Sequence, residues 1–329
     1  MRAAVCSRYG PPEALQVMEV DRPVPKDDEV LVRVRAACIN KADWIMIRGR
    51  PFAVRLMGSG LRTPKNPIPG SDIAGQVEAV GRNVKEFHPG DNVFGDLFEF
   101  GQGGYAEYAC ASEDAFSTMP ENITFEEAAA VPMAAITALQ ALRDEGKIQS
   151  GHKVLICGAS GGVGTFAVQI AKSFGAEVTA VCSTRNLDIA RSLGADHIID
   201  YTKEDFTKTG QHYDLIIGVN GYRSIFSYKR ALNPEGVYVM VGGRGPQLVQ
   251  AMLLGPLISA TGSRKVRSVS AMLNKKNMDS MGELLNTGKV VPVIDRRYPL
   301  DEIDKAFRYF EDGQARGKVV ITLEQNSKS

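Results

Sequence analysis

The sequence has few of the residues that bind metal ions or crosslink chains. Its 329 residues include 5 cysteines, 4 histidines and 1 tryptophan. The cysteines lie far apart in apolar, strand-like stretches, at Cys6, Cys38, Cys110, Cys157 and Cys182. No pair has the short spacing of a zinc knuckle or a redox motif, so we expect reduced thiols that are buried as small apolar side chains.

The sequence also lacks a charge excess and a long apolar run. The formal net charge is +1, which gives no electrostatic reason to expect a nucleic-acid partner. The longest apolar stretch, Leu248–Ile258, contains Gly255 and Pro256 and is much shorter than the roughly 20 residues of a membrane-spanning helix. The N-terminal stretch has no apolar core of a signal peptide. We therefore expect a cytoplasmic protein with no transmembrane segment.

Alternating patterns in the first 120 residues predict a mostly β region. Val30–Ala37 alternates apolar and polar residues with the period of a half-buried strand, and Asp72–Val80 and Tyr105–Cys110 do the same. Between them, Gly49–Asn66 has no clean period, which indicates a mobile loop.

After Pro120 the pattern changes to short apolar strands that alternate with helices. Thr124 is placed to cap a helix that begins at Glu126 and Glu127, and an alanine-rich helical run follows to about Glu145. The predicted strands are Lys153–Cys157, Glu177–Cys182, His197–Asp200, Tyr213–Val219 and Gly236–Val241. This alternation predicts an α/β fold with a doubly wound parallel sheet of the Rossmann type.

The C-terminal region returns to a different pattern. Val290–Tyr298 is predicted to be extended, Leu300–Asp312 to be a helix and Lys318–Leu323 to be a final strand. We expect that strand to pair with the N-terminal region. The predicted domains are therefore residues 1–122 plus 293–329, and an inserted nucleotide-binding domain of residues 123–292.

A glycine-rich turn is the most specific motif. Gly158 opens it directly after a five-residue apolar strand, and a helix follows at once. A turn of this kind lets a pyrophosphate approach backbone N–H groups at the start of the helix. We therefore predict a dinucleotide site that includes Ser160, Gly161, Gly162, Val163 and Gly164.

The end of the next strand indicates which coenzyme binds. A site for NAD places an acidic residue there, whereas Glu177–Cys182 is followed by Ser183, Thr184 and Arg185. A hydroxyl and a guanidinium suit a 2′-phosphate. We predict that Ser183 and Arg185 bind NADPH; an ordinary solvated charge is the alternative for Arg185.

Taken together, the motifs resemble those of the medium-chain dehydrogenase/reductase superfamily, in its zinc-less quinone oxidoreductase-like branch. The shared motifs are Asn40–Asp43, Pro69–Gly75, His88–Val93, Gly104–Tyr108, the glycine turn and Ala315–Val320. The resemblance covers essentially the whole chain. It implies that the N-terminal domain is GroES-like and that the Rossmann domain is inserted into it.

The resemblance also implies that the chain needs no zinc. Zinc-dependent relatives carry Cys, His and Cys as catalytic ligands, and those positions are Asn40, Ser71 and Met133 here. An amide, a hydroxyl and a thioether do not form a zinc site. The stretch that would hold the structural zinc, Gly95–Gly104, has no cysteine. We predict no bound metal.

Without a Lewis acid, the expected reaction is hydride transfer from NADPH to quinones or α,β-unsaturated carbonyl compounds in the interdomain cleft. Two alternatives stay open: reduction of enoyl thioesters, and a non-catalytic NADPH-binding protein that senses redox state. Asn40 is the candidate hydrogen-bond donor to the acceptor, and Asp43 is the candidate residue that orients a loop or holds a water. A turn residue at the strand end is the alternative for Asn40, and a helix cap is the alternative for Asp43.

Four further residues match coenzyme contacts of the family. They are Thr137 near the nicotinamide, Tyr201 near the adenosine phosphate, and Arg316 and Lys318 before the last strand. A backbone-bonded helix threonine, a surface aromatic and ordinary strand-flanking charges are the respective alternatives. Members of the family often form homodimers through the nucleotide-domain sheet. The candidate edge here is Tyr238–Gly243, but no feature of the sequence requires a dimer, so the monomer stays an open alternative.

Overall fold

The computed structural model describes residues 1–220, 222–243, 250, 253–256, 258–260, 262–269 and 274–323. The chain forms two compact units. One contains Met1–Met133, Leu273–Thr287 and Pro292–Ser329, and the other contains Ala134–Met272 and Gly288–Val291. The first unit is discontinuous in sequence, as expected. The exact domain boundaries given above stay a prediction. Part of the predicted apolar segment Leu248–Ile258, namely residues 248–249, 251–252 and 257, lies outside the described residues.

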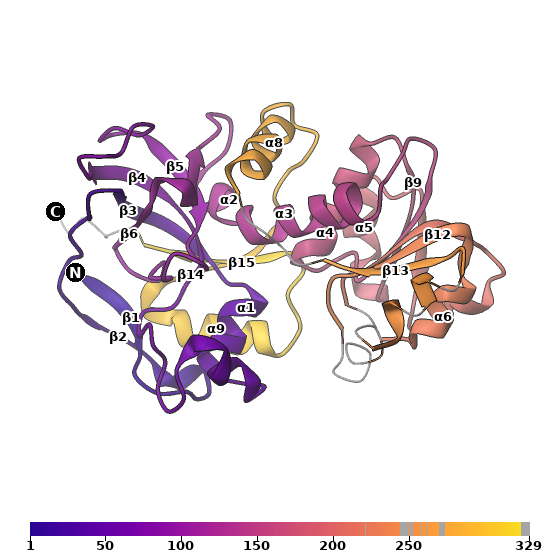
Figure 1. The fold of residues 1–329 in the computed structure, drawn as a ribbon, viewed down its shortest axis with the longest axis horizontal. Helices are drawn as coiled ribbons and strands as arrows, with labels where there is room; N and C mark the ends of the chain where they lie inside the picture. The colour runs from indigo at the N-terminus through magenta and orange to yellow at the C-terminus, as the bar shows by residue number, and fades with distance from the viewer. Residues whose placement is uncertain are drawn as a thin grey trace. The chain divides into compact units, whose positions relative to one another are not determined.

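The first unit is built on a mostly antiparallel sheet whose strand order is β14-β15-β3-β4-β5-β7, with β6 paired to β3 (Figure 1). The strand bounds are β3 Glu29–Cys38, β4 Asp72–Val80, β5 Asn92–Asp96, β6 Tyr108–Ser112, β7 Phe116–Thr118, β14 Ile294–Pro299 and β15 Lys318–Thr322. A separate hairpin joins β1 Arg2–Cys6 to β2 Leu15–Glu19. The last strand, β15, pairs antiparallel with β3, so the prediction that the C-terminus closes the N-terminal domain is confirmed.

Four helices accompany this sheet within the described residues of the unit: α1 Lys41–Arg48, α2 Phe125–Ala129, α8 Lys275–Asn286 and α9 Ile303–Glu311. Thr124 caps α2 as predicted, because its Oγ1 accepts a hydrogen bond from the Glu127 N–H at 3.2 Å while the Glu127 carboxylate accepts one from the Thr124 N–H at 2.8 Å. In the core, the rings of Tyr105 and Phe307 meet edge to face with centroids 5.7 Å apart.

The second unit contains a parallel six-stranded sheet in the order β10-β9-β8-β11-β12-β13. Its strands are β8 Lys153–Cys157, β9 Glu177–Cys182, β10 His197–Asp200, β11 Tyr213–Gly218, β12 Leu232–Met240 and β13 Lys265–Ser268, and its helices include α4 Gly162–Ser173, α5 Leu187–Ser192 and α6 Ile225–Arg230. The sheet grows in one direction from β8 to β10 and in the other from β11 to β13. The carboxyl end of β8 is therefore the switch point where such folds bind nucleotides.

Several local predictions are corrected by the structure. The strand expected at Tyr105–Cys110 begins at Tyr108, because Tyr105 donates instead to the Pro69 carbonyl. The expected loop 49–66 contains a helical turn, Arg55–Ser59.

The helical run expected to reach Glu145 is interrupted. It breaks after α2, and α3, Pro132–Leu139, begins at a proline, which lacks the N–H that a first helical turn leaves unpaired. Tyr238–Gly243 was also wrongly expected at the sheet edge, since β12 lies between β11 and β13. Within the described residues, no helix combines the length and the apolar character needed to cross a bilayer.

Candidate functional site

The glycine turn joins β8 to α4 within the second unit. Gly158 has a φ of +89°, a conformation that L-residues with a side chain rarely adopt. At Gly164, an added Cβ would stand 2.0 Å from the Gly158 carbonyl oxygen, so helix and turn pack too closely for any side chain there. The turn therefore has the shape that lets a pyrophosphate reach the start of α4.

The turn after β9 lies against the glycine turn. Asn186 is buried, and its Nδ2 donates to the Ser160 Oγ at 2.8 Å and to the Ser183 Oγ at 3.2 Å. One amide thus brings together two residues that the sequence placed at the coenzyme, 23 positions apart in the chain. Arg185 lies in the same turn and is exposed.

An acidic residue that the sequence analysis missed lies at the end of β10. Asp200 pairs across the strands with Cys182, and its carboxylate accepts hydrogen bonds from the Thr184 Oγ1 at 2.5 Å and the Thr202 Oγ1 at 2.7 Å. These hydrogen bonds, Thr184 first, lower the pKa of Asp200 to about 2. The Lys203 Nζ lies 3.7 Å from the carboxylate. The Asp200 carboxylate beside the Ser183 turn is therefore already bound by hydroxyl groups and an ammonium group of the protein.

Tyr201 follows Asp200 and is 46% exposed. Its ring lies 5.6 Å from that of Tyr222, centroid to centroid. Thr137, in α3, is buried. Arg316 is exposed, and its backbone N–H donates to the Asp295 carboxylate at 3.0 Å in the first unit.

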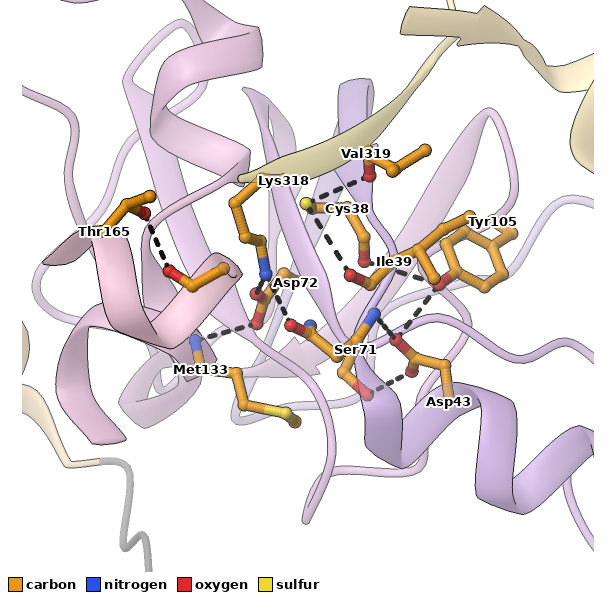
Figure 2. Close-up of polar contacts among 12 residues, drawn as sticks. Cys38, Ile39, Asp43, Ser71, Asp72, Tyr105, Met133, Thr165, Lys318 and Val319 are labelled. Atoms are coloured by element: carbon orange, nitrogen blue, oxygen red, sulfur yellow. Dashed lines mark hydrogen bonds and ion pairs between the residues drawn. The ribbon is translucent and has the colours of Figure 1, made fainter. Parts of the chain in front are cut away.

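A buried polar cluster occupies the first unit where α1 begins (Figure 2). Asp43 is fully buried and accepts three hydrogen bonds, from the Asn40 N–H at 2.8 Å, the Ser71 Oγ at 2.7 Å and the Tyr105 hydroxyl at 3.0 Å. Burial raises the pKa of Asp43, and these hydrogen bonds partly offset that rise. The alternative for Asp43 was a cap of a turn at Trp44–Ile47; the helix instead begins at Lys41, and Asp43, its third residue, caps it by accepting from the Asn40 N–H.

Lys318 lies in the same cluster with only 3% of its surface exposed. Its Nζ donates to the Asn40 Oδ1 at 2.5 Å and lies 3.7 Å from the Asp72 Oδ2. An ammonium group can only donate, so this contact fixes which end of the Asn40 amide is oxygen. The Asn40 Nδ2 must face away from Lys318, and it is buried without a hydrogen bond.

Two further carboxyls of this cluster, at Asp72 and Asp96, were missed from the sequence. They face each other across β4 and β5. Burial raises the pKa of Asp72 to about 7, and it would be higher without the Lys318 charge and the nearby Asn40 amide, which both lower it. The contact between the Asn40 amide and Asp72 does not have the geometry of a hydrogen bond. Burial and the neighbouring Asp72 charge raise the pKa of Asp96 well above its ordinary value. Lys318 is the ammonium group beside these carboxyls, so their mutual repulsion and their burial both disfavour the charged form of Asp96.

The three positions that match zinc ligands of relatives do not suit a zinc ion here. The Asn40 oxygen faces an ammonium group, and the Ser71 Oγ donates to Asp43. Burial also raises the pKa of the nearby Cys38 thiol to about 12, and its Sγ donates to the Val319 carbonyl oxygen at 3.2 Å. Across the described part of the chain, no group of three His, Cys, Asp or Glu residues is arranged to hold a metal ion.

The first unit also contains a cavity of about 600 Å³. α1 forms one wall through apolar side chains of Ala42, Ile45 and Met46, and the segment after α1 forms another. Gln102 lines the cavity too, in a left-handed backbone conformation with a φ of 62°. Its Nε2 is buried and has no hydrogen bond. An unpaired amide beside an apolar cavity is suited to a ligand that carries an oxygen.

Comparison with known proteins gives matches over nearly the whole chain. The alcohol dehydrogenase GroES-like domain family matches residues 26–121, and the zinc-binding dehydrogenase family matches residues 193–321. A chloroplastic quinone oxidoreductase of Triphysaria versicolor is 36% identical over 98% of both chains. A 2-methylene-furan-3-one reductase of Solanum lycopersicum is 35% identical over 98% of this chain and 79% of its own. The solved structure of a quinone oxidoreductase from Coxiella burnetii superposes with a TM-score of 0.87 at 30% identity, covering 98% of this chain and 99% of that one.

Proposed function

The chain belongs to the medium-chain dehydrogenase/reductase superfamily, among relatives named quinone and NAD(P)H oxidoreductases, and from this premise we propose that it is a zinc-independent NADPH-dependent reductase. Its acceptors are quinones or α,β-unsaturated carbonyl compounds. Both stabilise developing negative charge by conjugation, so they need an oriented hydride and a hydrogen bond more than a Lewis acid.

NADPH supplies the hydride when bound, and the chain's own residues hold it. Gly161, Gly162, Val163 and Gly164 offer the small residues of a pyrophosphate turn, with Ser160 held beside them. Ser183 and the exposed Arg185 are our candidates for the 2′-phosphate. Asp200 does not count against this choice, because it ends β10 rather than β9 and its carboxylate is already bound by two hydroxyls and lies 3.7 Å from Lys203.

We assign the remaining coenzyme candidates by their exposure. Tyr201 and Arg316 are accessible and stay proposed contacts; Thr137 is buried, and its proposed place near the nicotinamide rests on the family resemblance alone. Lys318 is buried in the polar cluster, so we propose that it acts through Asn40 rather than through a phosphate.

The observation that carries the proposal is the orientation of the Asn40 amide. Lys318 holds its oxygen, so the Nδ2 is the donor end of the amide; it is buried near the Asp72 carboxylate and makes no hydrogen bond of adequate geometry in the described chain. A carbonyl oxygen that becomes an enolate or quinol during hydride transfer is the natural partner of such a donor. Asp43 positions the backbone of Asn40 and does not touch the acceptor.

The test is to follow nicotinamide absorbance with NADPH and a panel of quinones, enones and enoyl thioesters. We expect oxidation with quinones or enones, and Asn40→Ala should lower kcat on the order of 10-fold or more while NADPH affinity changes little. If enoyl thioesters oxidise NADPH faster than quinones and enones do, enoyl thioesters would replace quinones and enones as the proposed acceptors. Tight NADPH binding with no oxidation by any acceptor would instead favour the sensing role.

Two further properties stay predictions. A homodimer through the nucleotide-domain sheet would use β13, the strand at that edge of the described sheet. A cytoplasmic location is predicted from the sequence, whereas relatives are named chloroplastic or mitochondrial.

A further inference from the structure

The segment that follows α1 carries an unusual local charge. Residues 44–71 contain Arg48, Arg50, Arg55, Arg62 and Lys65 and no Asp or Glu, in a chain whose net charge is only +1. Arg48 is used internally, in an ion pair with Glu311, and Arg55 packs over the ring of Tyr9. Two of the five cations therefore have a role within the unit.

The other three cations face solvent. Arg50, Arg62 and Lys65 are exposed, and none forms an ion pair with an acidic residue of the described chain. An excess of unpaired like charge in one short segment costs repulsion unless an anionic surface compensates it. The charges therefore indicate a partner that carries negative charge.

Exposed apolar side chains are interleaved with these cations. Phe52, Leu56 and Leu61 are 60%, 65% and 60% exposed. Phe98 and Phe100, on a neighbouring loop, are also exposed, which makes five of the 11 large apolar side chains exposed in the described chain. An acidic protein or a nucleic acid would compensate the charges but leave this apolar surface in water. The mixture suits the interface of a bilayer, where cations meet headgroups and apolar side chains enter the acyl region.

The same segment forms a wall of the cavity in the first unit. Val54, Ser59, Pro64, Lys65 and Asn66 line it, together with Phe98 from the neighbouring loop. Any partner surface that binds residues 50–66 is therefore next to the cavity. Glu99 is the acidic residue among the cavity-lining side chains, and it follows Phe98 directly.

We propose that residues 50–66 dock the protein on the surface of an anionic lipid bilayer, with Arg50, Arg62 and Lys65 at the headgroups and Phe52, Leu56 and Leu61 inserted below them. The attachment is peripheral. It places the cavity next to the lipid phase, from which an apolar acceptor can enter. This goes beyond the proposed reduction and does not depend on it.

The experiment is co-sedimentation of the full-length protein with vesicles of phosphatidylcholine alone or mixed with phosphatidylglycerol. We expect at least about tenfold more bound protein on the anionic vesicles at low salt, falling steeply as salt rises. Each cation near an anionic surface contributes about a fivefold gain, so Arg50→Glu with Arg62→Glu should reduce binding by at least roughly 25-fold. The matched control reverses Lys276 and Lys289, two exposed lysines in and after α8, with the same change in net charge and no loss of binding.

A second variant tests insertion. Phe52→Ser with Leu56→Ser should weaken binding to anionic vesicles at least about tenfold, because it removes apolar area that enters the bilayer. The midpoint of thermal unfolding, followed by circular dichroism, serves as the folding control and should be unchanged in all variants. The proposal is overturned if binding does not depend on the anionic lipid, if the α8 control loses binding equally, or if the serine variant binds as well as wild type. The last result would point to an acidic macromolecule instead.

Discussion

The glycine turn of the second unit and the polar cluster of the first unit solve opposite problems. The turn is neutral and contiguous, and it works because its residues are small. The cluster is charged and buried, and its central contact joins Lys318 to Asn40, 278 positions away in the chain. The turn fails if volume is added, whereas the cluster fails if a charge loses its partner. The glycine turn is therefore most sensitive to substitutions that add a side chain, and the polar cluster to substitutions that remove a charge.

Removing the cluster's ammonium should have the largest effect. Lys318→Met leaves Asp72 buried without its ion pair, so we expect the free energy of unfolding to fall by about 3–5 kcal/mol in urea denaturation. Adding Asp72→Asn removes the uncompensated charge and should restore most of the stability. If the single variant were as stable as wild type and lost only NADPH affinity, Lys318 would be a coenzyme contact and the contrast between the two regions would disappear.

Adding one methyl group to the turn should come next. Gly164→Ala places a Cβ 2.0 Å from the Gly158 carbonyl, so the turn must shift, at a cost of about 1–3 kcal/mol, seen as an approximately 5- to 150-fold loss of NADPH affinity by fluorescence titration. Gly161→Ala is the matched control, because its Cβ would meet nothing nearer than 3.7 Å. Equal losses in the two variants would show that close packing at Gly164 is not what matters.

The cluster should also make stability depend on pH. Burial raises the pKa of Asp72 from 3.8 to about 7, so the native state binds this proton more firmly than the unfolded state does. The stability that this proton contributes is full below about pH 4 and is lost as the pH rises through 7. The free energy of unfolding of wild type relative to Asp72→Asn should therefore fall with rising pH, by at most about 1.4 kcal/mol per pH unit. Thermal unfolding from pH 4 to 8 measures it, and a constant difference would contradict the assignment.

The smallest effect is expected at the exposed rim of the nucleotide unit. Arg185→Ala should raise the KM for NADPH about tenfold and leave the KM for NADH within about twofold, because a solvated charge–phosphate contact is worth about 1.4 kcal/mol. Initial rates with both coenzymes measure this. Lys229→Ala, on α6, is a control of like charge. A parallel loss with NADH would mean that Arg185 supports the turn rather than the 2′-phosphate.

The glycine turn is contiguous in sequence and the polar cluster is not, and this difference explains how well each region was predicted from the sequence. The strands β8, β9 and β10 were predicted to the residue, since a short apolar run is a local signal. The glycine turn was found but predicted to reach Gly164, whereas α4 begins at Gly162. A capping role for Asp43 was recognised as an alternative because its signal is also local. The cluster was not predicted, because it depends on β3, β4 and β15 lying side by side.

Three missed residues, Asp72, Asp96 and Gln102, show what a sequence signal could and could not have found. Asp72 stands directly after the Pro-Gly-Ser motif and could have been suspected from it. Asp96 and Gln102 have no such marker; only the pairing of β4 with β5 and the left-handed backbone at Gln102 reveal them. Lys318 was noticed in sequence, but its burial comes from its place at the start of a closing strand.

The most direct test of the account is the coenzyme preference of the purified protein with a soluble quinone, after exhaustive treatment with a metal chelator. The account predicts that kcat/KM is at least about tenfold higher for NADPH than for NADH and that the chelator leaves both values unchanged. A preference for NADH, or activity that disappears with the chelator and returns with zinc, would contradict it.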